Sequence, residues 1–281
     1  MKIGVIGTGT MGSLIIEALI KSKSVKPSHI WMTNRTEEKA RNLANAYPGL
    51  TVCPTPHEVI KHAAIVFLCI KPLQFFPLLQ SVQNTWRPDQ LAVSITSPIT
   101  LTQLEKMISC SVTRVVPSIV NQALAGSTLV TFGTSMNDRQ KTKIWTLLEN
   151  FSHPVEISEK NIRVASDLSS CGPAFLSFLL EKMIEGAVRS TPISEDDATE
   201  LVTQMVIGFG KLLEDQTFTL TELREKVTVK GGVTGVGLNV LKTGYGGVFE
   251  HLFEETRKKF IEDHQAVDPF FDQGDLPEES R

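Results

Sequence analysis

The first twelve residues constrain the fold of this chain more than any other stretch. Residues 2–6 read as a buried strand, and they run directly into the turn G-T-G-T-M-G at residues 7–12. The first glycine of such a turn permits a tight bend, the second lets a pyrophosphate approach bare backbone, and the third lets the next helix pack close to the sheet. The residues predicted to bind a dinucleotide at this turn are Gly7, Gly9, Thr10, Met11 and Gly12.

The sequence around this turn strengthens the prediction, because a lone G-x-G-x-x-G is a weak signal. Residues 11–23 have an amphipathic helical pattern, and a second strand at residues 30–33 closes a βαβ unit. The N-terminus of such a helix faces a phosphate with free N–H groups and a partial positive charge. A glycine turn that binds no ligand is the alternative.

The residues after the second strand indicate which dinucleotide binds. NAD sites usually carry an acidic residue here, whereas an arginine accommodates the 2'-phosphate of NADP. This chain has Asn34, Arg35 and Thr36, and its first carboxylate is Glu37. A guanidinium can hold a phosphate through two parallel hydrogen bonds, with Asn34 and Thr36 as neutral donors. We therefore predict that the cofactor is NADPH. In the alternative, Arg35 is a solvated residue that opens a charged helix.

The composition excludes several functional classes. A net charge of -3 over 281 residues gives no electrostatic reason to expect nucleic acid or an anionic membrane as a partner. No apolar run approaches the roughly 18 residues that cross a bilayer. The first strand begins at residue 2, which excludes a cleaved signal peptide there. We expect a cytoplasmic protein.

Cysteine and histidine usage favours neither a disulfide framework nor a metal site. The six histidines lack metal-ligand spacing, and the cysteines include no C-x-x-C pair. We therefore predict no bound metal and reduced, mostly buried thiols. The four cysteines are Cys53, Cys69, Cys110 and Cys171.

Alternating strand and helix patterns extend to about residue 158. Several strand patterns are apolar at nearly every residue, as strands covered on both faces must be. The alternation predicts an α/β fold, with a doubly wound sheet that forms a Rossmann-type NADP-binding domain over residues 1–158. Further strands are expected at residues 51–53, 65–70, 91–95, 112–116 and 129–132, and helices at residues 73–83 and 102–108.

The strand patterns end at residue 159. Apolar residues with helical spacing mark residues 174–189, 195–213 and 248–260, which predicts an all-helical domain over residues 159–265. Such a domain could close on itself or intertwine with a second copy.

The last residues, 266–281, are acidic and are expected to form a mobile tail. Pro269, Gly274 and Pro277 interrupt regular structure in this segment. In the alternative, Phe270 and Phe271 dock on the protein.

Three motifs resemble those of the pyrroline-5-carboxylate reductase family. The run S-D-L-S-S-C-G-P-A-F at residues 166–175 resembles the family segment that ends in G-S-G-P-A-Y. The run L-R-E-K-V-T-V-K-G-G-V-T at residues 223–234 resembles L-R-D-x-V-T-S-P-G-G-T-T, and Ile70, Lys71 and Pro72 resemble V-K-P. With the opening turn, the resemblance spans residue 1 to about residue 264 and is strongest to the late-competence branch called ComER.

The resemblance implies NADPH-dependent reduction of a cyclic imine acid, pyrroline-5-carboxylate, to L-proline or a close analogue. In this reaction hydride leaves the nicotinamide for the C=N carbon, and the nitrogen ends protonated. The resemblance also implies a dimerisation domain over residues 159–265, in a homodimer or a higher homo-oligomer. Each active site would then combine the sheet domain of one subunit with helices of both.

The resemblance also assigns the remaining site residues. It places Lys71 and Pro72 near the ribose and nicotinamide of the cofactor, with an ordinary turn and a solvated lysine as the alternative. A glycine turn that enters a helix can bind a carboxylate through its N–H groups. Thr234 would add the catalytic hydroxyl, unless it serves only as a helix N-cap. The predicted substrate-binding residues are Gly231, Gly232, Val233 and Thr234.

The chain departs from the family pattern on two sides of the expected substrate pocket. Residues 116–121 read V-P-S-I-V-N where the family usually has M-P-N-T-P-A, Val229 and Lys230 replace Ser-Pro, and Val233 replaces a threonine. These departures leave open a weakly active or non-enzymatic NADP(H)-binding regulatory protein linked to competence. A β-hydroxyacid dehydrogenase is disfavoured, because residues 172–180 lack the lysine that such enzymes place near the start of the central helix.

Overall fold

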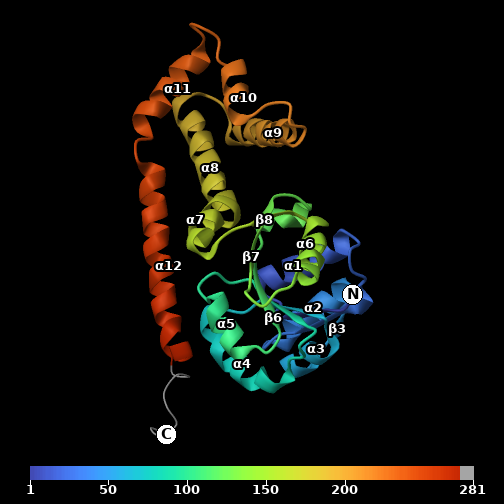
Figure 1. The fold of residues 1–281 in the computed structure, drawn as a ribbon. Coiled ribbons are helices and arrows are strands. Elements are labelled where there is room, and N and C mark those ends of the chain that lie inside the picture. Colours follow the sequence, from blue (N-terminus) through green and yellow to red (C-terminus); the bar gives the residue numbers. More distant parts are fainter. Residues whose placement is uncertain (273–281) are drawn as a thin grey trace. The chain divides into compact units, whose positions relative to one another are not determined.

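The computed structural model describes residues 1–272, which divide into two compact units. The first unit combines Met1–Pro173 with the segment that begins at Glu255, and the second is Ala174–Glu254. The first contains a sheet covered by helices, and the second is entirely helical (Figure 1). These features confirm the predicted fold class, a Rossmann-type α/β sheet followed by helices.

Eight strands form one sheet in the order β3-β2-β1-β4-β5-β6-β7-β8. Neighbouring strands are parallel except β6 and β7, which are antiparallel. From β1 to β3, each strand adds to the same side of the sheet, and β4 then pairs with the other side of β1. The strand order therefore reverses between β1 and β4. The strands are β1 (Ile3–Ile6), β2 (Ile30–Thr33), β3 (Thr51–Val52), β4 (Ile65–Leu68), β5 (Leu91–Ser94), β6 (Ser111–Val116), β7 (Ser127–Phe132) and β8 (His153–Glu156).

The helices and short helical turns connect these strands. In the first unit they are α1 (Thr10–Lys21), η1 (Pro27–His29), α2 (Glu37–Ala46), α3 (Pro56–His62), η2 (Pro72–Gln74), α4 (Phe75–Val82), η3 (Gln83–Thr85), α5 (Leu101–Met107), η4 (Ile119–Ala123), α6 (Asp138–Glu149), η5 (Glu159–Asn161), α7 (Ile162–Ser166) and the π-helical turn η6 (Asp167–Cys171). The remaining helices are α8 (Gly172–Ser190), α9 (Glu195–Glu214), α10 (Leu220–Lys226), α11 (Val233–Gly244) and α12 (Val248–Asp272).

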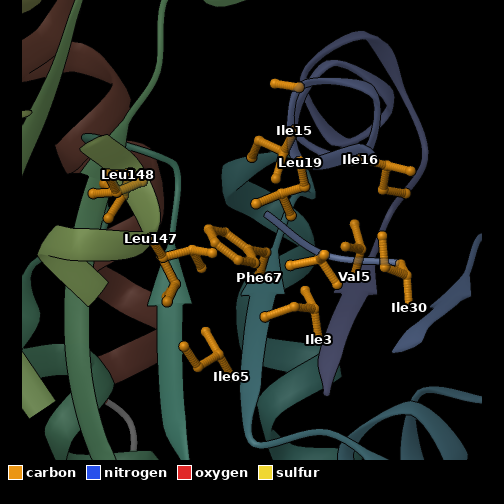
Figure 2. Packing of buried hydrophobic residues seen from close by; sticks show 14 of the residues in the cluster. Ile3, Val5, Ile15, Ile16, Leu19, Ile30, Ile65, Phe67, Leu147 and Leu148 are labelled. Carbon is orange, nitrogen blue, oxygen red and sulfur yellow. The ribbon is translucent and has the colours of Figure 1, made fainter. Parts of the chain in front are cut away.

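The core lies on both faces of the sheet, as the apolar strands predict. Alternate residues of β4 belong to different clusters: Ile65 and Phe67 pack on one face, Val66 and Leu68 on the other. Figure 2 shows the first cluster, where Phe67 lies among side chains of β1, α1 and α6. Full burial of one such side chain contributes about 1.5–3 kcal/mol. The two-sided core therefore holds the carboxyl ends of the central strands in place.

The strand β8 was not predicted from the sequence. Its four residues, H-P-V-E, carry a proline and polar ends, which are weak strand signals. It pairs with β7 in parallel, from Ser127 opposite His153 to Val130 opposite Glu156. Pairing at the sheet edge decides its conformation, because an edge strand tolerates a proline.

The prediction of a mobile tail from residue 266 is wrong for residues 266–272. Residues 266–272 are the last turns of α12, and Val267 and Phe271 are only 2% and 6% exposed. Pro269 lies inside this helix, where it removes one backbone hydrogen bond, close to the end of the helix. Burial of two apolar side chains offsets that loss, so this segment docks on the protein through Val267 and Phe271, whereas Phe270 stays 43% exposed. The rest of the predicted tail, residues 273–281, lies outside the described residues.

The helical unit leaves much of its apolar surface exposed. The large apolar side chains that are more than half exposed include Leu176, Phe178, Met183, Leu201, Val236 and Val240. No helix within residues 1–272 is long and apolar enough to span a membrane.

Candidate functional site

The candidate cofactor site lies at the carboxyl ends of β1 and β4, where the strand order reverses. Ligands of doubly wound sheets bind at such a switch point. Gly7 follows β1 with a φ of +99°, and a Cβ atom there would lie 2.2 Å from the carbonyl oxygen of Cys69, which follows β4. The backbone conformation and the close approach of the two loops therefore both require glycine at position 7.

The next two glycines of the turn differ in what surrounds them. A Cβ atom on Gly12 would lie 1.9 Å from the carbonyl oxygen of Gly7, so Gly12 lets α1 pack against the turn. A Cβ atom on Gly9 would have no heavy atom of the described residues within 4 Å, apart from those of its chain neighbours. Packing within the protein thus does not require glycine at position 9, which instead leaves open space beside the start of α1.

The start of α1 fits a pyrophosphate. Its first intrahelical bond runs from the N–H group of Ser13 to the carbonyl of Gly9 at 2.9 Å, and no side chain caps the helix. The N–H groups of residues 10–12 therefore have no acceptor within the helix. Together with the open space at Gly9, they form a backbone cradle for a diphosphate.

Asn34 joins the glycine turn to the loop after β2. Its Oδ1 atom accepts a hydrogen bond from the N–H group of Thr8 at 2.9 Å, and its Nδ2 atom donates to the carbonyl of Thr36 at 2.9 Å. From the sequence, Asn34 is predicted only as a donor to the phosphate. The structure shows a positioning role, which nothing in the local sequence indicates.

Arg35 is exposed and makes no hydrogen bond or ion pair within residues 1–272. The first carboxylate after it, Glu37, pairs with Arg41 at 2.6 Å. Thr36 precedes α2 as its N-cap, without a side-chain bond to the helix. The guanidinium of Arg35 is therefore free to bind an external anion.

Lys71 and Pro72 lie at the same edge of the sheet as the glycine turn. The Lys71 side chain is exposed, and its backbone is fixed by Gln74, whose side chain accepts from the Lys71 N–H group at 3.4 Å. In return, the Gln74 N–H group donates to the Lys71 carbonyl at 2.9 Å. These bonds close η2 and hold Lys71 at the carboxyl end of β4.

The loop after β6 is bonded to the π-helical turn η6. The Ser118 hydroxyl donates to the carbonyl of Ser169 at 2.8 Å, and the Ser170 hydroxyl donates to the carbonyl of Pro117 at 2.9 Å. Ser118 is 1% exposed, so its hydroxyl is engaged within the protein. The sequence shows the departure at position 118 but does not predict these bonds, because they join residues more than fifty positions apart.

A buried carboxylate supports the same turn. Asp167 is 1% exposed and accepts hydrogen bonds from Arg163 at 2.7 Å and from the Thr256 hydroxyl at 2.7 Å. The Cys171 sulfur lies 3.3 Å from an Nη atom of Arg163. These contacts explain the aspartate near the start of the 166–175 motif, because Asp167 holds η6 in place.

All four cysteines are free thiols. Burial raises the pKa of Cys69, and it raises the pKa of Cys110 to about 12. These two thiols stay protonated at neutral pH, so neither is an activated nucleophile. Within the described part of the chain, no three His, Cys, Asp or Glu side chains are grouped as metal ligands.

The predicted substrate turn lies in the helical unit and enters a helix, as the motif indicates. Gly231 has a φ of +77°, and Gly232 is the N-cap of α11, with no side-chain cap. Thr234 lies inside the first turn, so its alternative role as the N-cap is wrong. Its hydroxyl makes no hydrogen bond within residues 1–272. The helix start therefore offers free N–H groups and one free hydroxyl.

Comparison with known proteins matches two parts of the chain to two family models. A family model described as "Pyrroline-5-carboxylate reductase dimerisation" matches residues 159–263, and one described as "NADP oxidoreductase coenzyme F420-dependent" matches residues 2–98. Among solved structures, pyrroline carboxylate reductase from Plasmodium falciparum with NADP bound has a TM-score of 0.79 at 21% identity, covering 95% of this chain and 98% of that chain.

Two curated relatives from Bacillus subtilis (strain 168) extend over nearly the whole chain. ComE operon protein 4 is 46% identical over 267 residues, covering 95% of this chain and 98% of the relative, which confirms the resemblance to the late-competence branch. Pyrroline-5-carboxylate reductase 3 is 30% identical over 260 residues, covering 92% of this chain and 95% of the relative. From these matches and the site described above, the chain belongs to the pyrroline-5-carboxylate reductase family.

Proposed function

We propose that this chain is an NADPH-dependent reductase that converts pyrroline-5-carboxylate, or a close analogue, to L-proline or its counterpart. The observation that carries the proposal is a pair of uncapped helix starts, each preceded by glycines. One, at α1, suits the pyrophosphate of the cofactor, and the other, at α11, suits the carboxylate of an imine acid. Membership of the family supports the same reaction.

NADP(H) is the cofactor that best suits the sheet unit. The N–H groups at the start of α1 would bind the pyrophosphate, and the free guanidinium of Arg35 would bind the 2'-phosphate. Lys71 would lie near the ribose. The description of the family model over residues 2–98 and the NADP in the Plasmodium falciparum structure support this assignment. When bound, NADPH supplies the hydride.

The protein contributes mainly position and charge to such a reaction. N–H groups at the start of α11 would hold the substrate carboxylate, and the Thr234 hydroxyl would bond the carboxylate or the imine nitrogen. Holding two reactants in an attack geometry contributes up to roughly 7–11 kcal/mol. This explains how a site without an assigned ionisable acid can carry out the reduction.

A homodimer or higher homo-oligomer is part of the proposal. The family model that covers residues 159–263 is named for dimerisation. The helical unit also exposes apolar side chains such as Met183 and Val240, which a second copy would cover.

The proposal is tested by NADPH oxidation with pyrroline-5-carboxylate as substrate. Thr234→Ala should lower kcat/KM by about ten- to a hundredfold, the range for loss of one hydrogen bond to a charged group. NADPH affinity should not change, because Thr234 belongs to the other unit. The matched control is Thr243→Ala on the same helix, whose hydroxyl donates to the carbonyl of Asn239 and should not matter for activity.

A non-enzymatic NADP(H)-binding regulator is the second candidate, because the expected pocket has lost polar groups. The Ser118 hydroxyl is engaged with Ser169, and Ile119 and Val233 replace family threonines. The two candidates predict different results. Tight NADPH binding with no oxidation by any cyclic imine acid, and no effect of Thr234→Ala, would reject the reductase and favour the regulator.

A further inference from the structure

The end of α12 packs on the unit that carries the cofactor site. We propose that residues 265–271, here named the C-terminal clasp, hold residues 71–76 in the conformation that binds the cofactor. This inference rests on the NADPH site proposed above. The match with the dimerisation family ends at residue 263, so the clasp lies beyond the part of the chain that this match describes.

Apolar contacts attach the clasp to α4 and α5. Val267 and Phe271 are buried in the same cluster as Phe75 and Leu79 of α4 and Leu104 of α5. In Figure 1 the red end of α12 lies beside these two helices. The clasp is therefore part of the core that covers one face of the sheet.

Aromatic side chains extend this attachment to the first turn of α4. The ring of Phe76 lies 5.7 Å from the ring of Phe271 in an edge-to-face arrangement, and 6.3 Å from that of Phe270. A polar contact fixes the register of the clasp, since Gln103 of α5 donates to an Oδ atom of Asp268 at 2.9 Å. The clasp thus contacts α4 through aromatic rings and α5 through a hydrogen bond.

The first turn of α4 continues directly from the cofactor loop. The turn η2 ends at Gln74, α4 begins at Phe75, and Gln74 makes both hydrogen bonds that fix the Lys71 backbone. Phe75 is fully buried and directly follows Gln74 in the chain. A shift of the first turn of α4 therefore also moves Gln74. Because Phe76 is packed against the clasp, the clasp restrains the position of Lys71 through one helical turn.

Release of the clasp should therefore lower the fraction of molecules in which residues 71–76 are in the binding conformation. The apparent dissociation constant rises in inverse proportion to that fraction. If the ordered state falls to between a tenth and a fifth of the population, the Kd for NADPH rises about five- to tenfold. The phenylalanines of the clasp are positioning residues in this proposal, because they act through α4.

The test compares NADPH binding by the full chain and by Phe271→Ala, well below the unfolding temperature. We expect the Kd and the KM for NADPH to rise about five- to tenfold while kcat stays within twofold. Phe271→Leu should restore the affinity. Ile261→Ala is the matched control, since Ile261 is on the same helix but 45% exposed, and it should leave the Kd unchanged.

Hydrogen exchange of the cofactor-free protein gives a second measurement that needs no ligand. Amide protons of Lys71 and of residues 73–76 should exchange faster in Phe271→Ala, and in a chain that ends after His264, than in the full chain. Unchanged exchange there, or an unchanged Kd in both variants, would overturn the proposal. Failure of the full chain to bind NADPH would instead reject the proposed cofactor, and the exchange rates would still decide whether the clasp orders residues 71–76.

Discussion

At the scale of single residues, Asn34 and Arg35 have different roles in the loop after β2. Asn34 uses both ends of its amide within the protein, which holds this loop against the glycine turn. Arg35 has no partner in the described residues, and Arg41 neutralises the nearby carboxylate of Glu37. One residue therefore shapes the site while the next remains free to bind a ligand.

This division leads to a prediction about coenzyme preference. If Arg35 binds the 2'-phosphate, the protein should bind NADPH well over tenfold more tightly than NADH, because a charge-assisted hydrogen bond contributes about 1.5–3 kcal/mol. Arg35→Asp should remove or invert the preference, whereas Lys39→Ala, an exposed change on α2, should not. Fluorescence titration with the two coenzymes measures both constants. Equal constants in the unmodified protein would contradict the role of Arg35.

At the scale of elements, a buried arginine and a partly exposed glutamate form a network whose charges act on His264 of α12. Arg114 of β6 is 1% exposed, bonds the carbonyl of Ile99, and pairs with Glu159 at 3.0 Å. Burial lowers the pKa of Arg114, and the Glu159 carboxylate opposes this effect. Glu159 also accepts from the N–H group of Leu101 at 3.1 Å, so the network joins β6, η5 and α5.

His264 on α12 makes stability depend on pH. Its ring packs edge-on against Phe260 at 4.5 Å, and burial lowers its pKa below the usual 6.5. The unfolded chain therefore binds a proton at a higher pH than the folded chain, so the free energy of unfolding decreases as the pH falls below about 6.5 and levels off below the folded pKa. The charged groups near His264 are Arg114, Glu159, Asp263 and Asp268.

Melting temperatures of the full chain and of His264→Gln between pH 5 and pH 8 test this effect. The unmodified protein should lose more stability on acidification than the variant, because only it gains a proton on position 264 when it unfolds. Above about pH 7.5 His264 is neutral in both states, so the two slopes should agree and serve as the internal control. A steeper acid slope in the variant would show that the sign is wrong.

At the scale of the whole molecule, the two units bury their apolar residues to different extents. The sheet unit has apolar clusters on both faces, whereas α8 to α11 expose many large apolar side chains. On α11, Val236 and Val240 are one turn apart and both 67% exposed. A stripe of this kind on a surface helix is typical of a protein interface.

Light scattering should therefore find a dimer or a larger assembly at micromolar concentration. Burial of one such side chain contributes about 1.5–3 kcal/mol, so the double change Val236→Asp and Val240→Asp should shift the equilibrium towards the monomer. Lys242→Asp adds the same residue on the opposite side of α11 and is the control. A monomeric unmodified protein would contradict the proposed assembly.

Local signals in the sequence determined the central part of the fold and the candidate ligand turns. The conformations of Gly7 and Gly231 follow from the glycine patterns, and the burial of β4 follows from its apolar run. These features depend on residues close together in the chain, whose backbone preferences and periodicity can be read directly. The absence of an acidic residue at positions 34 and 36, beside Arg35, can also be read directly from the sequence.

Only the tertiary structure decided which distant residues meet. The bond from Thr8 to Asn34 spans 26 positions and that from Ser118 to Ser169 spans 51, so no local pattern predicts either. The end of α12 is the clearest case, since its acidic residues and Pro269 favour an irregular tail when considered alone. Burial of Val267 and Phe271 against α4 and α5 stabilises a helix there instead, because tertiary packing outweighs a weak local propensity.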